Sequence, residues 1–162
     1  MDPVQQLVEI EAIKQLKARY MRSVDTKAWG DLAATFTPDA CCEYSDGKFR
    51  FEGRDAIIGF LSESLGSTQI ATMHQSHTPE IEVTSETTAR GTWYFEDVVI
   101  NPLSVSDRMP HGTVLHGTGI YHDEYVKHEG AWQISLTGYE RIFEFLQPRD
   151  PNSRLRTRWD TR

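Results

Sequence analysis

The chain has 162 residues, 38% of them hydrophobic and 25% charged, a balance typical of one folded domain and not of a disordered or membrane-spanning chain. Its formal net charge of -7 argues against a broad nucleic-acid-binding surface, because phosphate binding needs clustered positive charge. The two cysteines, Cys41 and Cys42, are neighbours and indicate no disulfide framework.

The first half of the chain predicts three helices and one hairpin. The helices are expected over residues 4–24, 28–36 and 55–65. The first begins without an apolar signal-like stretch, and no run approaches membrane-spanning length, so we expect a cytoplasmic protein. Asp46-Gly47 predicts a two-residue turn between short strands at residues 41–45 and 48–52.

The second half predicts long strands. They are expected over residues 80–83, 88–100, 113–127 and 131–145, which are rich in β-branched and aromatic residues. Helices gathered before long antiparallel strands predict an α+β domain and not a βαβ repeat.

We place this domain at residues 1–147 and a basic C-terminal tail at 148–162. The tail is interpreted as a solvated or subunit-contacting end, with polyanion binding as the alternative. The stretch 101–111, with two prolines, is expected to be a loop that could cover a pocket mouth.

Alternation along the strand at 88–100 places Asp97 on one face with Trp93 and Phe95. A carboxylate on a buried face must be paired, hydrogen-bonded or shifted in pKa. The alternative is an aspartate at a strand end in contact with water. On the last strand Tyr139 and Arg141 share a face opposite Trp132, Ile134 and Leu136, and alternation does not decide which face lines a cavity.

Two histidines, His74 and His77, form an H-x-x-H at the start of a strand. That spacing suits a helix face better than a strand, so a single histidine acting as acid or base is favoured over a metal site. Tyr20 lies on the apolar stripe of the first helix, and its hydroxyl needs a partner or a ligand. Asp25 follows that helix and is either functional or an ordinary cap.

Several segments resemble a known family. The stretches IEAIKQLKARYMRSVDTKAW, TMHQSHTPEIEV, TTARGTWYFEDVVI and TGYERIFEF resemble the bile acid 7α-dehydratases. More broadly, they are similar to the SnoaL-like branch of the nuclear transport factor 2-like superfamily, which includes scytalone dehydratase. The resemblance implies a cone-shaped α+β barrel, in which N-terminal helices pack on a strongly curved, mostly antiparallel sheet around an active-site hollow. It also implies a homotrimer or homodimer.

The resemblance implies a set of site residues as well. The catalytic residues that it implies are Tyr20, Asp25, His74 and Asp97, and the substrate-binding residues are Tyr44 and Arg141. Further candidates for substrate binding are Trp93, Phe95 and Tyr139, which share strand faces with Asp97 or Arg141.

The predicted reaction is cofactor-independent and metal-free elimination of water from a hydroxylated, carbonyl-activated substrate. The substrate is expected to be steroid- or bile-acid-like or aromatic polyketide-like, free or as a coenzyme A thioester. In this hypothesis His74 takes the proton, Asp25 orients the imidazole, and tyrosine hydroxyls donate to the oxyanion or to the departing hydroxyl. Asp97 holds the substrate hydroxyl or, if protonated by burial, acts as the acid. Arg141 binds a substrate anion or pairs with an acid.

Two alternatives stay open at this point. An isomerase of the ketosteroid type or a polyketide cyclase needs the same base and donors without a leaving group. A non-catalytic small-molecule-binding or assembly module belongs to a different class, because one fold serves many functions.

Overall fold

The computed structural model describes residues 1–160. In chain order its elements are α1 (Pro3–Thr26), α2 (Trp29–Ala33), β1 (Phe36–Tyr44), β2 (Phe49–Glu52), α3 (Arg54–Leu65), β3 (Ala71–Val83), β4 (Thr88–Asn101), β5 (Thr113–His128) and β6 (Ala131–Pro148). The strands form one sheet in the order β2-β1-β6-β5-β4-β3. Neighbours are antiparallel except β1 and β6, which are parallel. The predicted α+β class, with N-terminal helices on a mostly antiparallel sheet, is confirmed.

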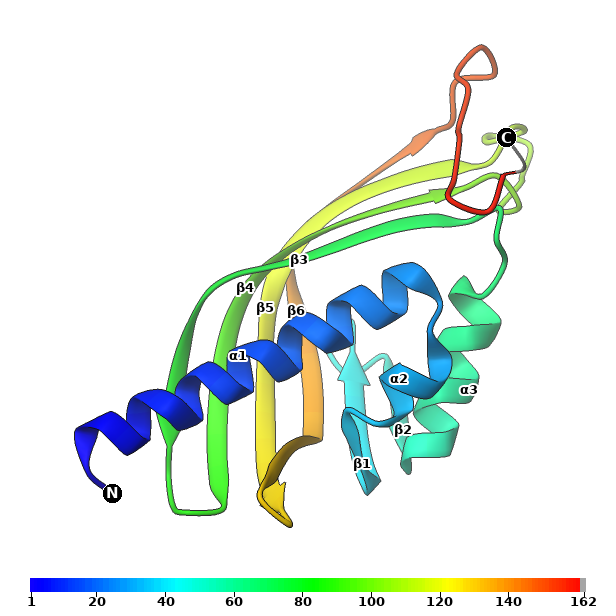
Figure 1. Ribbon diagram of the computed structural model, residues 1–162. Coiled ribbons are helices and arrows are strands. Elements are labelled where there is room, and N and C mark those ends of the chain that lie inside the picture. The colour runs from blue at the N-terminus through cyan, green and yellow to red at the C-terminus, as the bar shows by residue number, and fades with distance from the viewer. Residues whose placement is uncertain (161–162) are drawn as a thin grey trace.

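Helix α1 supplies the main cover of the sheet. It begins where the side chain of Asp2 accepts hydrogen bonds from the backbone N–H groups of residues 4 and 5. Its apolar stripe, which includes Ile13, Leu16 and Tyr20, is buried. Figure 1 shows α1 crossing obliquely in front of β3 to β6, with α2 and α3 beside it. The long strands bend over this helix layer (Figure 1).

Bulges in the long strands change which residues face the helices. In β6 the pairing with β5 shifts at Ser135, which lies between Ile134 and Leu136. An extra residue reverses the alternation, so Ile134 and Thr137 are both fully buried. The prediction that Tyr139 faces opposite to Ile134 is therefore wrong, because strict alternation takes no account of a bulge.

Three predicted boundaries are also corrected. The second helix ends at Ala33 instead of residue 36, because Phe36 already pairs with β6 at Ile134. The strand expected at 80–83 begins at Ala71, so both histidines of the H-x-x-H lie within it. The hairpin turn between β1 and β2 spans residues 45–48 instead of two residues, and Ser45, Asp46 and Gly47 all have positive φ.

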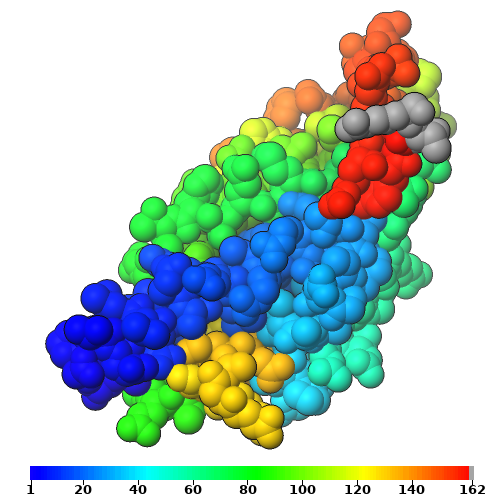
Figure 2. All heavy atoms as spheres, viewed as in Figure 1, coloured from blue at the N-terminus to red at the C-terminus, as the bar shows by residue number. Residues whose placement is uncertain are grey.

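The C-terminal segment returns to the helices after β6. The ammonium of Lys27 lies 5.1 Å from the ring centroid of Trp159, and it also donates to the carbonyl of Leu65 at the end of α3. In Figure 2 the segment that ends the described chain lies against the helical layer. Residues 161–162 of the predicted tail lie outside the described residues. Within residues 1–160 no helix is long and apolar enough to cross a membrane.

Candidate active site

A histidine and an aspartate meet where α1 ends beside β3. The Nδ1 atom of His74 lies 2.7 Å from Oδ1 of Asp25, and the backbone N–H of His74 donates to Oδ2 at 2.9 Å. The hydroxyl of Thr72 donates to Oδ1 at 2.7 Å. Because Asp25 engages Nδ1, Nε2 is the ring nitrogen that a substrate can reach.

The environment of Asp25 favours its ionised form. Burial raises its pKa, but the hydrogen bonds and charge of His74 and the hydroxyl of Thr72 outweigh that effect. The net pKa of Asp25 is therefore lower than its usual value. Side-chain exposures of 12% for His74 and 23% for Asp25 leave the pair reachable from one side. An ionised Asp25 can orient the imidazole and support its protonated form.

His77 lies away from this pair. Its side chain is 47% exposed, on the other side of β3, with its ring 6.0 Å from that of Tyr94. His77 lies against Tyr94 and Glu96 of β4, whereas His74 is held by Asp25, so the two histidine rings do not meet at a common metal position. Among residues 1–160 no group of three histidine, cysteine, aspartate or glutamate side chains is arranged to hold a metal ion.

Phenol groups form the opposite part of the site. The hydroxyls of Tyr20 on α1 and Tyr44 on β1 lie 3.0 Å apart and share one hydrogen bond. Burial raises the pKa of both tyrosines well above the usual value. The two phenols therefore stay protonated at neutral pH and can act as hydrogen-bond donors.

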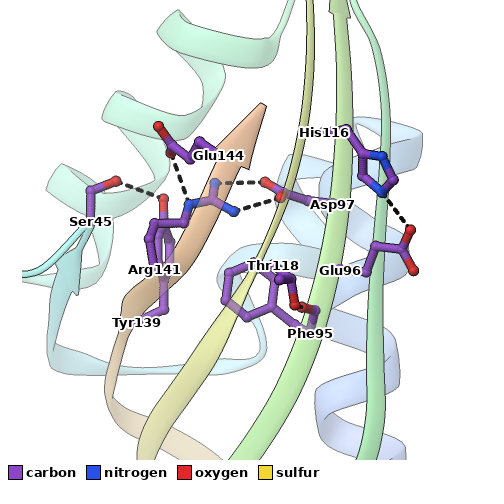
Figure 3. A network of polar contacts seen from close by, with 9 residues as sticks. All are labelled: Ser45, Phe95, Glu96, Asp97, His116, Thr118, Tyr139, Arg141 and Glu144. Atoms are coloured by element: carbon purple, nitrogen blue, oxygen red, sulfur yellow. Dashed lines mark hydrogen bonds and ion pairs between the residues drawn. The ribbon is translucent and has the colours of Figure 1, made fainter. Parts of the chain in front are cut away.

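An ion pair crosses the floor of the site (Figure 3). Arg141 on β6 donates to both carboxylate oxygens of Asp97 on β4, at 2.6 and 2.8 Å. Glu144 lies 2.9 Å from Nε of Arg141. Burial lowers the pKa of Arg141, but the hydrogen bonds and charge of Asp97, together with Tyr139 and Glu144, outweigh that effect, and the net pKa is higher than usual. Two of the predicted roles lose support as a result. Both carboxylate oxygens of Asp97 accept hydrogen bonds from Arg141, which does not fit the role of a proton donor, and Arg141 already binds an acidic group of its own chain.

These groups surround one cavity of about 170 Å³ between the helices and the sheet. Six predicted site residues line it, namely Tyr20, Tyr44, His74, Asp97, Tyr139 and Arg141. Asp25 is not among the lining residues and lies behind His74. The predicted cover at residues 101–111 contributes no residue to the lining.

Trp93 and Phe95 do not line the cavity, contrary to their predicted substrate-binding role. The indole N–H of Trp93 donates to the hydroxyl of Tyr125 at 2.9 Å, deeper in the core. Phe95 packs against the rings of Tyr121 and Tyr139, at 4.6 and 5.1 Å between centroids. Both residues are on the inner face of β4, as alternation predicts, but they pack against other core residues instead of facing the cavity.

Tyr121 on β5 is a lining residue that sequence reasoning missed. Alternation along β5 places it on one face with Gly117, Gly119 and Asp123, so a signal was present. The apolar wall from α3, which includes Phe60, Leu61 and Leu65, had no such signal. Helical periodicity shows that these residues are buried but not that they face a cavity.

With this geometry in view, the chain is recognised as a small α+β domain with a ligand-sized internal hollow. It belongs to the SnoaL-like domain family, which matches residues 5–137.

Solved structures agree on the fold. A type 2 hexachlorocyclohexane dehydrochlorinase (LinA) is 16% identical, with a TM-score of 0.77 over 94% of this chain and 100% of the other. A candidate scytalone dehydratase from Novosphingobium aromaticivorans is 24% identical, with a TM-score of 0.73 over 94% and 92%. A Mycobacterium tuberculosis protein of unknown function is 26% identical, with a TM-score of 0.66 over 87% and 76%.

Proposed function

We propose that this protein is a cofactor-independent lyase that eliminates water from a hydroxylated, carbonyl-activated substrate. The observation that carries the proposal is the His74–Asp25 pair on the same cavity as the hydrogen-bonded phenols of Tyr20 and Tyr44. A base and two neutral donors on one apolar hollow are what removal of a proton beside a carbonyl requires. A simple binding pocket needs no such pair.

In the first step Nε2 of His74 takes a proton from the carbon next to the carbonyl. The C–H electron pair moves toward the carbonyl oxygen, and the enolate charge that develops there is stabilised by the hydroxyls of Tyr20 and Tyr44. Asp25 holds the imidazole in position and stabilises the imidazolium through Nδ1.

In the second step the enolate electrons form the carbon–carbon double bond and the hydroxyl leaves. The imidazolium of His74 returns its proton to this hydroxyl, so one water molecule departs and the enzyme is regenerated. Asp97 accepts a hydrogen bond from the substrate hydroxyl and orients it, while the two hydrogen bonds from Arg141 hold this carboxylate in place.

An isomerase of the ketosteroid type is a second candidate, because the same base and phenol donors on one cavity serve it and it needs no leaving group. The same imidazolium would then return the proton to a different carbon of the substrate.

We propose a steroid-like, bile-acid-like or aromatic polyketide-like substrate, free or as a coenzyme A thioester. Support comes from the cavity lining, in which the aromatic rings of Phe60, Tyr121 and Tyr139 accompany aliphatic side chains. A homodimer or homotrimer is part of this proposal, and light scattering at several protein concentrations tests it.

The deciding experiment incubates the protein with hydroxy-ketosteroids, bile-acid thioesters and hydroxylated aromatic ketones, and analyses the products by mass spectrometry. A lyase yields a product lighter by one water molecule, whereas an isomerase yields one of unchanged mass. His74→Ala should lower the rate by about 100- to 10,000-fold. His77→Ala, on the other side of the same strand, is the matched control and should keep the rate. An unchanged rate in His74→Ala rejects the mechanism.

A further inference from the structure

A second ion pair lies entirely inside the protein and has no part in the proposed reaction. The ammonium of Lys17 on α1 donates to Oδ2 of Asp123 on β5 at 2.7 Å, and both side chains are 0% exposed. The hydroxyls of Tyr125 and Thr137 also donate to Asp123, each at 2.7 Å. None of these four residues lines the cavity. Removing two charges from water costs free energy that their attraction often only offsets. Stabilisation of the fold alone therefore does not explain why this pair is present.

The neighbours of Lys17 connect this pair to the site. Its Nζ atom lies 3.6 Å from the ring centroid of Tyr121 and 4.9 Å from that of Tyr20. Both tyrosines line the cavity. The ammonium therefore touches Asp123 and the two aromatic rings at once, and the positive end of the pair lies against the phenols.

We infer that the Lys17–Asp123 pair is a positioning device that orients the cavity phenols of Tyr20 and Tyr121 as hydrogen-bond donors to an oxyanion. A cation over a ring face is attracted to the ring and fixes its plane. The inference rests on the proposed function because it assigns these donors to a negative oxygen of the substrate.

Asp123 is needed as well as Lys17 in this arrangement. A lysine in a fully buried place loses charge unless an anion balances it, and burial does lower the pKa of Lys17. Asp123 opposes that effect by charge and by its hydrogen bond. The carboxylate is in turn held by Tyr125 and Thr137, away from the cavity lining. The pair thus keeps a positive charge beside the phenols in the absence of solvent.

The test replaces both charges at once. Lys17→Met alone would leave an unpaired buried carboxylate and is expected to unfold the protein, whereas Lys17→Met with Asp123→Asn leaves a neutral, similarly shaped pair. The matched control is a second, partly buried pair between the same helix and the same strand, in which Lys127 on β5 donates to both oxygens of Glu9 on α1 at 2.8 Å. Glu9→Gln with Lys127→Met neutralises that pair, and neither of its residues lines the cavity.

The readout is binding of para-nitrophenol, whose ionised form is a coloured oxyanion, followed by absorbance across its titration. We expect the wild-type protein to bind the phenolate, and the folded Lys17→Met/Asp123→Asn protein to bind it about tenfold more weakly. The Glu9→Gln/Lys127→Met protein should keep the wild-type affinity. Near-UV circular dichroism checks that each variant is folded. Wild-type affinity in the folded Lys17→Met/Asp123→Asn protein, or no phenolate binding by the wild type, overturns the inference.

His74→Ala separates this inference from the proposed function. That variant should lose turnover yet still bind para-nitrophenolate, because the phenol donors remain. If His74→Ala turns over substrate normally while the neutral-pair variant binds phenolate weakly, the proposed reaction fails and the role of Lys17 stands.

Discussion

Asp97 on β4 and Arg141 on β6 are joined by two hydrogen bonds that cross the strand between them. Strand β5 separates the two, and Asp97 pairs directly with Gly117 of β5. A Cβ atom at Gly117 would lie 2.6 Å from Nη1 of Arg141 and 2.9 Å from Oδ1 of Asp97. Because Gly117 has no side chain, the charged groups of Asp97 and Arg141 can meet across β5.

Gly117→Ala should separate the Asp97–Arg141 pair, because one of its charged ends must move away from the new methyl group. We expect a loss of about 1–3 kcal/mol in the free energy of unfolding and a lower rate of turnover. Urea denaturation followed by circular dichroism measures the first effect. Gly59→Ala is the control, since nothing lies within 4 Å of its added Cβ and alanine favours the helix there. Equal stability of the two variants would contradict this account.

The stability of the protein should depend on pH through Asp25. Its pKa is lower in the folded protein than in the unfolded chain, where it is about 3.9. The contribution of Asp25 is therefore complete at neutral pH and is lost as the pH falls through the folded-state pKa. We expect Asp25→Asn to be less stable than the wild type by about 1–3 kcal/mol at pH 7, with the difference shrinking below about pH 4. Thermal melts from pH 7 down to pH 3 test this, and a constant difference would refute it.

Tyr20→Phe and Tyr44→Phe should each slow turnover by about 100-fold, as loss of one oxyanion donor does in other enzymes. Their effects should not be additive, because the two hydroxyls share one hydrogen bond and removing either disturbs both. The double variant completes the thermodynamic cycle. Tyr94→Phe, at an exposed tyrosine that does not line the cavity, is the control and should keep the wild-type rate. Strict additivity would show that the phenols act independently.

Removal of residues 149–162 tests whether the domain folds without the segment that follows β6. Strand β6 ends at Pro148, and the segment after it contributes the half-buried side chains of Leu155 and Trp159. We expect a folded protein whose free energy of unfolding is lower by about 1–3 kcal/mol, from the apolar area that these contacts bury. Far-UV circular dichroism and gel filtration measure the outcome. An unfolded or aggregated product would show that the domain needs the tail.

Much of this architecture can be predicted from local pattern. The stripe of α1 and the alternation of β4 indicate that Tyr20 and Asp97 face inward, because periodicity follows from the backbone geometry of a helix or strand. The prediction that His74 acts together with Asp25 rests instead on the family resemblance. Spacing by itself does not decide which histidine of the H-x-x-H is functional, or whether Asp25 is a functional residue or an ordinary helix cap.

The sequence by itself therefore determined the fold class, the main helix and the inward residues of regular strands. Only the tertiary structure decided that Tyr139 and Arg141 face the cavity, because the bulge at Ser135 reverses the alternation of β6. It also decided that Asp97 pairs with Arg141 over Gly117 and that Lys17 lies buried against Tyr121. Each of these contacts joins elements far apart in the chain, and local periodicity carries no information about the register that brings such elements together.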